Sequence, residues 1–479
     1  MAHARPLFIA HEWKRTARTV PVLNPFTGER VADVCQADQA EAEAATAAAV
    51  SAFQSMRRLS SHARSHALAT LASQLTTRQD EFAKTITAES GKPITDARRE
   101  VNRAIQTCVI AAEEAKRIPG QVLPLDWTPG MESYLGLTRR VPIGPILGIT
   151  PFNFPLNLVV HKLAPALAAG NSIVIKPAPQ TPLTALLIGE LILQTDLPPG
   201  AVSIVPCANT VAEQMVTDSR FKLLSFTGSA AVGWMLKSKC GKKKVVLELG
   251  GNAGVIVEPD ADLDLAAQRC VAGGYTYSGQ TCISVQRVYV HADVYEIFLQ
   301  KLITNLRTLK SGDPSDDGTV VGPVIDQGAA RRIEEWMREA VAQGARVNVG
   351  GARSGALLEP TVLTDVTPSM KVSSQELFGP LLTVTPYTGF DDALTALNDS
   401  EYGLQAGVFT QDVNKIFRAY RELEVGAVVA NEIPTFRADH MPYGGVKESG
   451  VGREGVRYAI EDMTELKLLV LNLRDTPSA

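Results

Sequence analysis

The sequence predicts an α/β protein with two α/β domains and a small additional β element. Two long regions, from Ile143 to Leu249 and from Gly254 to about Val429, each alternate short apolar runs with helical stretches. This alternation is typical of a parallel sheet covered by helices. At 479 residues the chain is also too long for one small core, so two or three domains are expected.

The part of the chain before the first region is predicted to form short strands, then helices, then one longer strand. Residues 1–35 surround the turn NPFTGE, in which Asn, Pro and Gly supply the turn geometry. From residue 37 to about 116 the pattern is helical, with leucines at spacings of three and four. Residues 120–142 contain prolines and then a predicted strand at 133–141.

Five apolar runs in the first region are the predicted strands of a parallel sheet: ILGIT, SIVIKP, AVSIVP, LLSFTGS and VVLELGG. Ligands of such a sheet bind at the carboxyl ends of the strands. Here these ends carry KPA at 176–178 and FTGS at 226–229. We therefore expect a ligand site along this edge of the sheet.

The second region is predicted to contain the strands GVIVEP, VQRVYVH and AGVFT and helices at 296–310 and 327–343. The glycine-rich stretch at 442–455 then leads into another helix. The apolar run at 465–473 is a predicted closing strand with no partner nearby in sequence. Because an unpaired apolar strand promotes aggregation, it is expected to join a sheet, of this chain or of another subunit.

Composition excludes several classes of protein. A charged fraction of 20% and a net charge of −4 argue against nucleic acid or an anionic membrane as the main partner. The six cysteines form no CxxC pair, so neither a metal site nor a disulfide framework is expected, and a reducing cytoplasm fits. No signal peptide is recognised, and the apolar window at 156–175 is broken by polar residues, as in a buried helix followed by a strand.

Glu248 and Cys282 are the main candidates for catalysis. They lie near the two ends of the stretch 247–282, and each stands among glycines, where backbone can approach a ligand closely. A thiol beside a carboxylate suits covalent chemistry on a carbonyl group, since the sulfur attacks and the carboxylate moves protons. A single cysteine or glutamate is usually structural, and the flanking motifs favour the functional interpretation.

Two glycine-rich segments are candidates for a phosphate site. Gly228 and Ser229 follow an apolar run and precede a predicted helix, whose free amides could bind a pyrophosphate. The stretch GVGREG at 450–455 also matches GxGxxG. It follows a loop, and too little of the chain remains after it for a βαβ unit, so we reject it as a dinucleotide fingerprint.

Seven motifs occur in a fixed order along nearly the whole chain: PFNFP, IKPA, FTGS, LELGG, GQTCIS, QELFGP and PYGGVKESG. Together they resemble the aldehyde dehydrogenase superfamily, and in particular its lactaldehyde and non-phosphorylating glyceraldehyde-phosphate dehydrogenase-like branches. The resemblance implies a Rossmann-like cofactor domain (1–122, 143–249 and 447–461), a second α/β catalytic domain (250–446) and a β oligomerisation element (123–142 and 462–479). It also implies a homodimer or homotetramer.

The resemblance assigns roles to individual residues. Cys282 is the expected nucleophile, Glu248 the general base, and Asn153 forms an oxyanion hole with the Cys282 backbone N–H. We expect the thiol pKa to be lowered from about 8.5 to about 7 by amides, a lysine or Glu248. The cofactor is NAD or NADP, and the residues expected to bind it are Lys176 (adenosine ribose), Gly228 and Ser229 (pyrophosphate), Glu376 (nicotinamide ribose), Leu249 and Phe378. Lys162 matches a recurrent active-region position.

The sequence departs from the family pattern at Pro179. Members of the family often place a glutamate there, which binds the adenosine 2′-hydroxyl. Proline can neither accept that hydrogen bond nor repel a 2′-phosphate, and Lys176 nearby favours phosphate. We therefore expect Pro179 to border the cofactor and NADP to be accepted or preferred.

The expected reaction is oxidation of a small, hydroxylated or anionic aldehyde to its carboxylic acid through a cysteine thiohemiacetal and thioester. A CoA-acylating enzyme and a catalytically silent binding relative are the alternatives. Phe154 is expected to keep the site apolar. Four basic residues could recognise the substrate, although solvent exposure or ion pairing would explain each of them as well: Arg103, Arg287, Arg437 and His440.

Overall fold

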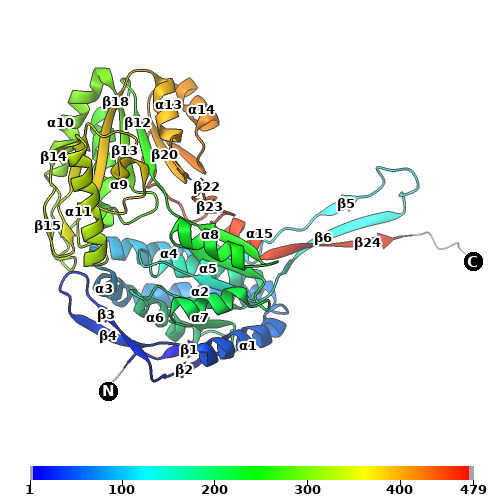
Figure 1. The fold of residues 1–479 in the computed structure, drawn as a ribbon. Helices are drawn as coiled ribbons and strands as arrows, with labels where there is room; N and C mark the ends of the chain where they lie inside the picture. Colours follow the sequence, from blue (N-terminus) through cyan, green and yellow to red (C-terminus); the bar gives the residue numbers. More distant parts are fainter. Residues whose placement is uncertain (1–3, 474–479) are drawn as a thin grey trace, which may run out of the picture.

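The computed structural model describes residues 4–473, which form two helix-covered sheets and a projecting arm (Figure 1). The amino-terminal end of the predicted 1–122 segment and the carboxy-terminal end of the predicted 462–479 segment lie outside the described residues. Both sheets are largely parallel, as the alternating pattern predicts. No helix in the described part of the chain is long and apolar enough to cross a membrane.

The first sheet has eight strands in the order β2-β1-β9-β8-β7-β10-β11-β23. Its five central strands are parallel and coincide with the five predicted apolar runs. The amino-terminal strands and β23 extend it as antiparallel edges. The strands are β1 Leu7–Ile9, β2 Glu12–Lys14, β7 Ile146–Ile149, β8 Ile173–Lys176, β9 Val202–Ile204, β10 Leu223–Thr227, β11 Lys244–Glu248 and β23 Gly450–Val451.

Helices pack around this sheet, and the predicted helical stretch from 37 to 116 is divided among four of them (Figure 1). α5 is buried along its whole length, which explains why the 156–175 window is so apolar. The helices are α1 Gln39–Met56, α2 Ser61–Thr77, α3 Gln79–Ser90, α4 Ile94–Glu114, α5 Asn157–Ala169, α6 Leu183–Ile192, α7 Asn209–Thr217, α8 Ala230–Lys239 and α15 Val456–Asp462.

The second sheet has seven strands in the order β14-β17-β18-β13-β12-β20-β21, and only β14 is antiparallel. The strands are β12 Ala253–Val257, β13 Val285–His291, β14 Arg346–Val349, β17 Thr361–Thr364, β18 Leu381–Tyr387, β20 Gln405–Phe409 and β21 Ala427–Ala430. The helical elements that accompany it are α9 Leu263–Tyr275, η1 Thr276–Gly279, η2 Ala292–Val294, α10 Tyr295–Leu306, α11 Gln327–Ala342, α12 Lys371–Ser374, α13 Phe390–Asn398 and α14 Val413–Glu422.

The closing strand finds its partner within the chain. β24 (Thr464–Asn472) pairs antiparallel with β6 (Tyr134–Pro142), which also pairs with β5 (Val122–Pro124), and the three strands form the projecting arm (Figure 1). Several apolar side chains of β24 remain exposed. Three short pairs complete the fold: β3 Thr19–Leu23 with β4 Arg30–Cys35, β15 Arg353–Ser354 with β16 Leu357–Leu358, and β19 Tyr402–Gly403 with β22 Val446–Lys447.

Candidate active site

A cavity of about 440 Å³ is lined by residues that end or follow strands of the first sheet, by the segments before β13 and β18 of the second sheet, and by residues of α4. This volume lies within the usual range for small-molecule sites. Asn153 comes from the loop before α5, Glu248 ends β11, and Cys282 follows η1. The structure therefore brings the three predicted catalytic side chains into one cavity, although they come from three separate segments of the sequence.

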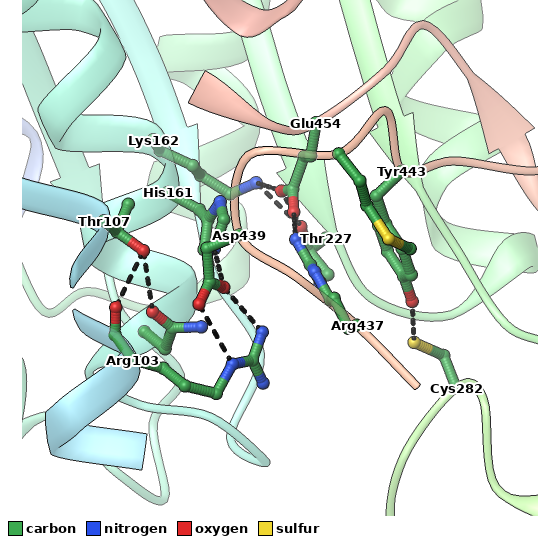
Figure 2. A network of polar contacts seen from close by, with 12 residues as sticks. Arg103, Thr107, His161, Lys162, Thr227, Cys282, Arg437, Asp439, Tyr443 and Glu454 are labelled. Carbon is green, nitrogen blue, oxygen red and sulfur yellow. Dashed lines mark hydrogen bonds and ion pairs between the residues drawn. The ribbon is translucent and has the colours of Figure 1, made fainter. Parts of the chain in front are cut away.

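Cys282 is half-buried, and its sulfur lies 2.9 Å from the hydroxyl of Tyr443 (Figure 2). Its loop packs closely on the LELGG segment, since a Cβ added to Gly251 would come within 2.1 Å of the Cys282 carbonyl oxygen. Only glycine at 251 permits this approach. The two motifs that suggested catalysis are thus in direct contact.

The expected lowering of the thiol pKa is wrong. Burial raises the pKa of Cys282 to about 12, since a charged sulfur loses its hydration there. The hydrogen bond from Tyr443 and the charge of Arg437 act in the opposite direction, but the carboxylates of Glu376 and Glu248 add to the increase. Burial and the acidic side chains around the sulfur outweigh the favourable contacts that we had expected.

Asn153 is held against the segment that carries the cysteine. Its Nδ2 donates to the carbonyl oxygen of Gln280 at 3.0 Å, while its Oδ1 is buried without a hydrogen-bond partner among the described residues. The amide therefore has one N–H committed to the Cys282 loop and one free to face the cavity. This placement is compatible with an oxyanion donor.

Glu248 is buried, and neither carboxylate oxygen has a hydrogen-bond partner within the described chain. Burial, and then the neighbouring charge of Glu454, raise its pKa well above the usual value. Glu454, in contrast, has two cationic hydrogen-bond donors. It accepts from Lys162 Nζ at 3.3 Å and from Arg437 Nη2 at 2.9 Å. Burial alone would raise the pKa of Glu454, but these cations bring it down to about 2. Glu454 therefore carries the negative charge while Glu248 tends to hold a proton.

A second network fixes the loop that precedes PYGG. Asp439 accepts from Arg103 Nη2 at 2.7 Å and lies 2.9 Å from His161 Nε2 (Figure 2). These contacts join the loop to α4 and α5. Arg437 in the same loop lines the cavity, whereas His440 is exposed and is not among the lining residues.

Two of the four basic candidates lie away from the cavity. Arg287 was a wrong candidate, because its buried guanidinium donates to the carbonyl oxygens of Asn252 and Leu397 and ties the second sheet together. His440 is the second of these two residues, since its side chain is exposed and does not line the cavity. Arg103 and Arg437 remain, and both line the cavity beside Phe154.

Five of the residues expected to bind the cofactor share this cavity: Gly228, Ser229, Leu249, Glu376 and Phe378. α8 starts directly after Ser229, whose side chain does not cap it, so the helix keeps free N–H groups for a phosphate. Glu376 accepts from the Gly251 N–H at 2.9 Å, and burial raises its pKa to about 7. A Cβ at Gly250 would lie 2.4 Å from this carboxylate. The residues present thus fit a pyrophosphate-containing dinucleotide.

The other two predicted cofactor residues lie beyond the cavity lining. Lys176 ends β8 and is buried, with its Nζ donating to Asn209 Oδ1 at 3.2 Å. Pro179 follows it in the exposed turn before α6. Both stand at the carboxyl edge of the first sheet, on the same edge as Ser229.

A model of the aldehyde dehydrogenase family matches residues 13–469. The chain belongs to this family. The match covers the second sheet, all of the first sheet except the edge strand β1 and the first residue of β2, and most of the arm. No group of three or more His, Cys, Asp or Glu side chains in residues 4–473 could hold a metal ion.

Relatives within the aldehyde dehydrogenase family match almost the whole chain. The 3-sulfolactaldehyde dehydrogenase of Priestia megaterium is 44% identical over 468 residues, 98% of each protein. The crystal structure of aldehyde dehydrogenase 21 from Physcomitrella patens, in complex with the reaction product succinate, has a TM-score of 0.97 and 43% identity over 99% of each chain. Glyceraldehyde-3-phosphate dehydrogenase of Methanocaldococcus jannaschii, complexed with NADP, has a TM-score of 0.92 and 36% identity, covering 95% of this chain and 100% of that one. The predicted family and branch are therefore confirmed.

Two residues of this aldehyde dehydrogenase site were missed by the sequence analysis. Tyr443 lies in the motif PYGGVKESG, where the sequence indicated no role for it, and its hydroxyl contacts the cysteine sulfur. Glu454 lies inside the stretch GVGREG, which was rejected as a dinucleotide fingerprint. The rejection agrees with the structure, where this stretch forms an edge strand and a loop, but the glutamate in it is buried beside Glu248.

Proposed function

We propose that this aldehyde dehydrogenase oxidises a small anionic aldehyde to the carboxylic acid, with NAD or NADP as electron acceptor. The observation that carries the proposal is one cavity lined by the Cys282 thiol, the buried Glu248 carboxylate and three arginines, Arg99, Arg103 and Arg437. The names of the relatives support an anionic substrate, since sulfolactaldehyde and succinate both carry a negative charge.

In the proposed mechanism the Cys282 thiolate attacks the aldehyde carbon, and the electron pair of the C=O bond moves to oxygen. Asn153 Nδ2 and the Cys282 N–H donate to this oxyanion, which is worth roughly 3–4 kcal/mol in comparable sites. A dinucleotide held at Ser229 and Glu376 would supply the acceptor for the hydride that leaves the carbon. Glu248 then takes a proton from water, which attacks the thioester and releases the acid and the thiol.

The anion-recognising group in this proposal is Arg437. Its Nη2 is committed to Glu454, but its Nε is buried without a hydrogen-bond partner among residues 4–473. An unpaired buried donor is costly, and a sulfonate or carboxylate oxygen in the cavity would satisfy it. Arg103 adds positive charge, and Phe154 supplies an apolar wall.

Replacement of Arg437 with lysine is expected to raise KM for an anionic aldehyde about tenfold, because the positive charge beside Glu454 remains but the Nε donor is lost. KM for propionaldehyde, which has no anion, should change less than about twofold. Steady-state kinetics on both aldehydes give the comparison, with the exposed Arg457→Lys as matched control. Equal changes in KM for the two substrates would contradict this role.

Replacement of Pro179 with glutamate is expected to lower kcat/KM for NADP at least about tenfold relative to NAD. A carboxylate there would repel the 2′-phosphate and could accept from a 2′-hydroxyl. Pro179→Ala serves as control, since it removes the ring without adding charge. The assignment of NADP as an accepted cofactor fails if the unaltered protein uses NAD at least about tenfold more efficiently than NADP.

Formation of NAD(P)H on a panel of aldehydes tests the function itself. We expect sulfolactaldehyde or succinic semialdehyde, which are anions, to be oxidised faster than neutral propionaldehyde without CoA. Turnover that requires CoA would favour the acylating alternative, and no turnover of any aldehyde would favour a silent relative.

We also propose that the exposed apolar face of β24 mediates homo-oligomerisation. The proposed domain boundaries follow the two sheets and the arm. The free cysteines suit a reducing cytoplasm.

A further inference from the structure

Tyr443 presents its hydroxyl to the cysteine sulfur. The side chain is buried, and Figure 2 shows the phenol oxygen directed at Cys282, 2.9 Å from Sγ. A buried tyrosine hydroxyl normally has a hydrogen-bond partner. Among the described residues, the only partner of this hydroxyl is the thiol.

Both the backbone and the ring of Tyr443 are held in place by neighbouring residues. The Tyr443 N–H donates to the Glu454 carbonyl oxygen at 3.0 Å, and the Glu454 N–H donates back to Tyr443 at 2.6 Å. The guanidinium carbon of Arg437 lies 3.7 Å from the ring centroid. The ion pair between Arg437 and Glu454 in turn fixes that stacked arrangement (Figure 2). The hydroxyl is therefore positioned by its surroundings before a substrate arrives.

We propose that Tyr443 is a catalytic residue whose hydroxyl donates a hydrogen bond to the Cys282 sulfur and stabilises the thiolate before attack. The inference rests on the proposed nucleophilic role of Cys282. The thiol proton leaves to solvent, and the phenol keeps its own proton throughout. When the sulfur–carbon bond forms, the sulfur loses its charge and the hydrogen bond weakens, so the tyrosine favours ionisation without binding the product thioester strongly.

The charges around the sulfur explain why a neutral donor matters here. Burial raises the pKa of Cys282, and Glu376 and Glu248 raise it further, whereas the Tyr443 hydrogen bond and Arg437 lower it. The pKa of Tyr443 itself is raised well above the usual value by burial, so its hydroxyl stays protonated and remains a donor. Tyr443 is thus the one uncharged group that favours the thiolate among these neighbours.

The rate of Cys282 alkylation by iodoacetamide, followed by mass spectrometry from pH 7 to 9.5, tests the proposal on the full-length protein. Loss of a hydrogen bond to a charged group shifts the equilibrium about tenfold, which is about one pH unit. Tyr443→Phe should therefore alkylate about tenfold more slowly at each pH, with the line of log rate against pH displaced upward in pH by about one unit. The control is Tyr295→Phe, which removes a hydroxyl that contacts the Val384 carbonyl oxygen and not Cys282. Its alkylation rate should match that of the unaltered protein.

A second substitution is expected to change the alkylation rate in the opposite direction. 3-Fluorotyrosine at position 443 is a stronger donor and should accelerate alkylation relative to tyrosine, which also covers the case of a Tyr443→Phe protein that fails to fold. Unchanged or faster alkylation in Tyr443→Phe overturns the proposal, as does slower alkylation with fluorotyrosine. Alkylation needs no aldehyde, so this outcome is independent of whether Cys282→Ala abolishes turnover, which tests the proposed function separately.

Discussion

Cys282→Ala is expected to reduce aldehyde oxidation by at least about 10⁴-fold, because it removes the only thiol among the residues that line the cavity. The other five cysteines are buried and are not among the residues that line this cavity. Loss of one small side chain leaves the loop and its contact with Gly251 in place, so dinucleotide binding should persist. NAD(P)H absorbance gives the activity, and quenching of tryptophan fluorescence gives binding.

The matched control for this experiment is Cys35→Ala, which removes a buried thiol from β4, outside the cavity lining. It should retain turnover within about twofold. Undiminished oxidation by Cys282→Ala would refute the covalent mechanism and, with it, the roles given to Asn153 and Glu248.

Glu248→Gln is expected to lower the steady-state rate by about 10²–10⁴-fold, the usual contribution of a general base. Acylation of Cys282 does not need this carboxylate, so one equivalent of NAD(P)H should still form rapidly before turnover stalls. Rapid-mixing absorbance detects the burst, and mass spectrometry detects the thioester. Glu213→Gln, at an exposed ion pair with Lys239, is the control.

The pH dependence of kcat follows from the pKa of Glu248. Burial and Glu454 raise the pKa of Glu248, and the base works only after it loses its proton. We therefore expect kcat to rise with pH through the neutral and alkaline range where water attack limits the rate, and this rise should disappear in Glu248→Gln. A kcat that falls over this range would contradict the assignment of Glu248 as the base.

The local pattern of residues predicted most of the fold. Alternating apolar and helical stretches correspond to the two parallel sheets, and the strand at 465–473 matches β24 within one residue at each end. The family resemblance grouped its partner β6 with it in one β element, but the local residue pattern alone could not select that partner, because the two strands lie far apart along the chain. Glycine-rich motifs pointed to Glu248 and Cys282, and the structure places both in one cavity, where glycine permits the close approach of Gly251 to the cysteine loop.

The polar environment of the site was predicted less well. Which arginine pairs with which carboxylate depends on contacts between distant parts of the chain, such as Arg103 with Asp439, and no short spacing encodes them. Arg287 looked like a substrate group in sequence but satisfies backbone carbonyls instead. The thiol pKa was misjudged for a similar reason, since it depends on burial and on Glu376, which lies in a different segment of the chain.

The proposed catalytic pair is split between the two halves of the molecule. Glu248 ends a strand of the first sheet, and Cys282 lies in the loop before β13 of the second, so neither half contains a complete site. Heating that loosens the contact between the halves would separate base from nucleophile while most helices and strands persist. Inactivation would then precede the loss of circular dichroism, and a dinucleotide that bridges both halves would delay it.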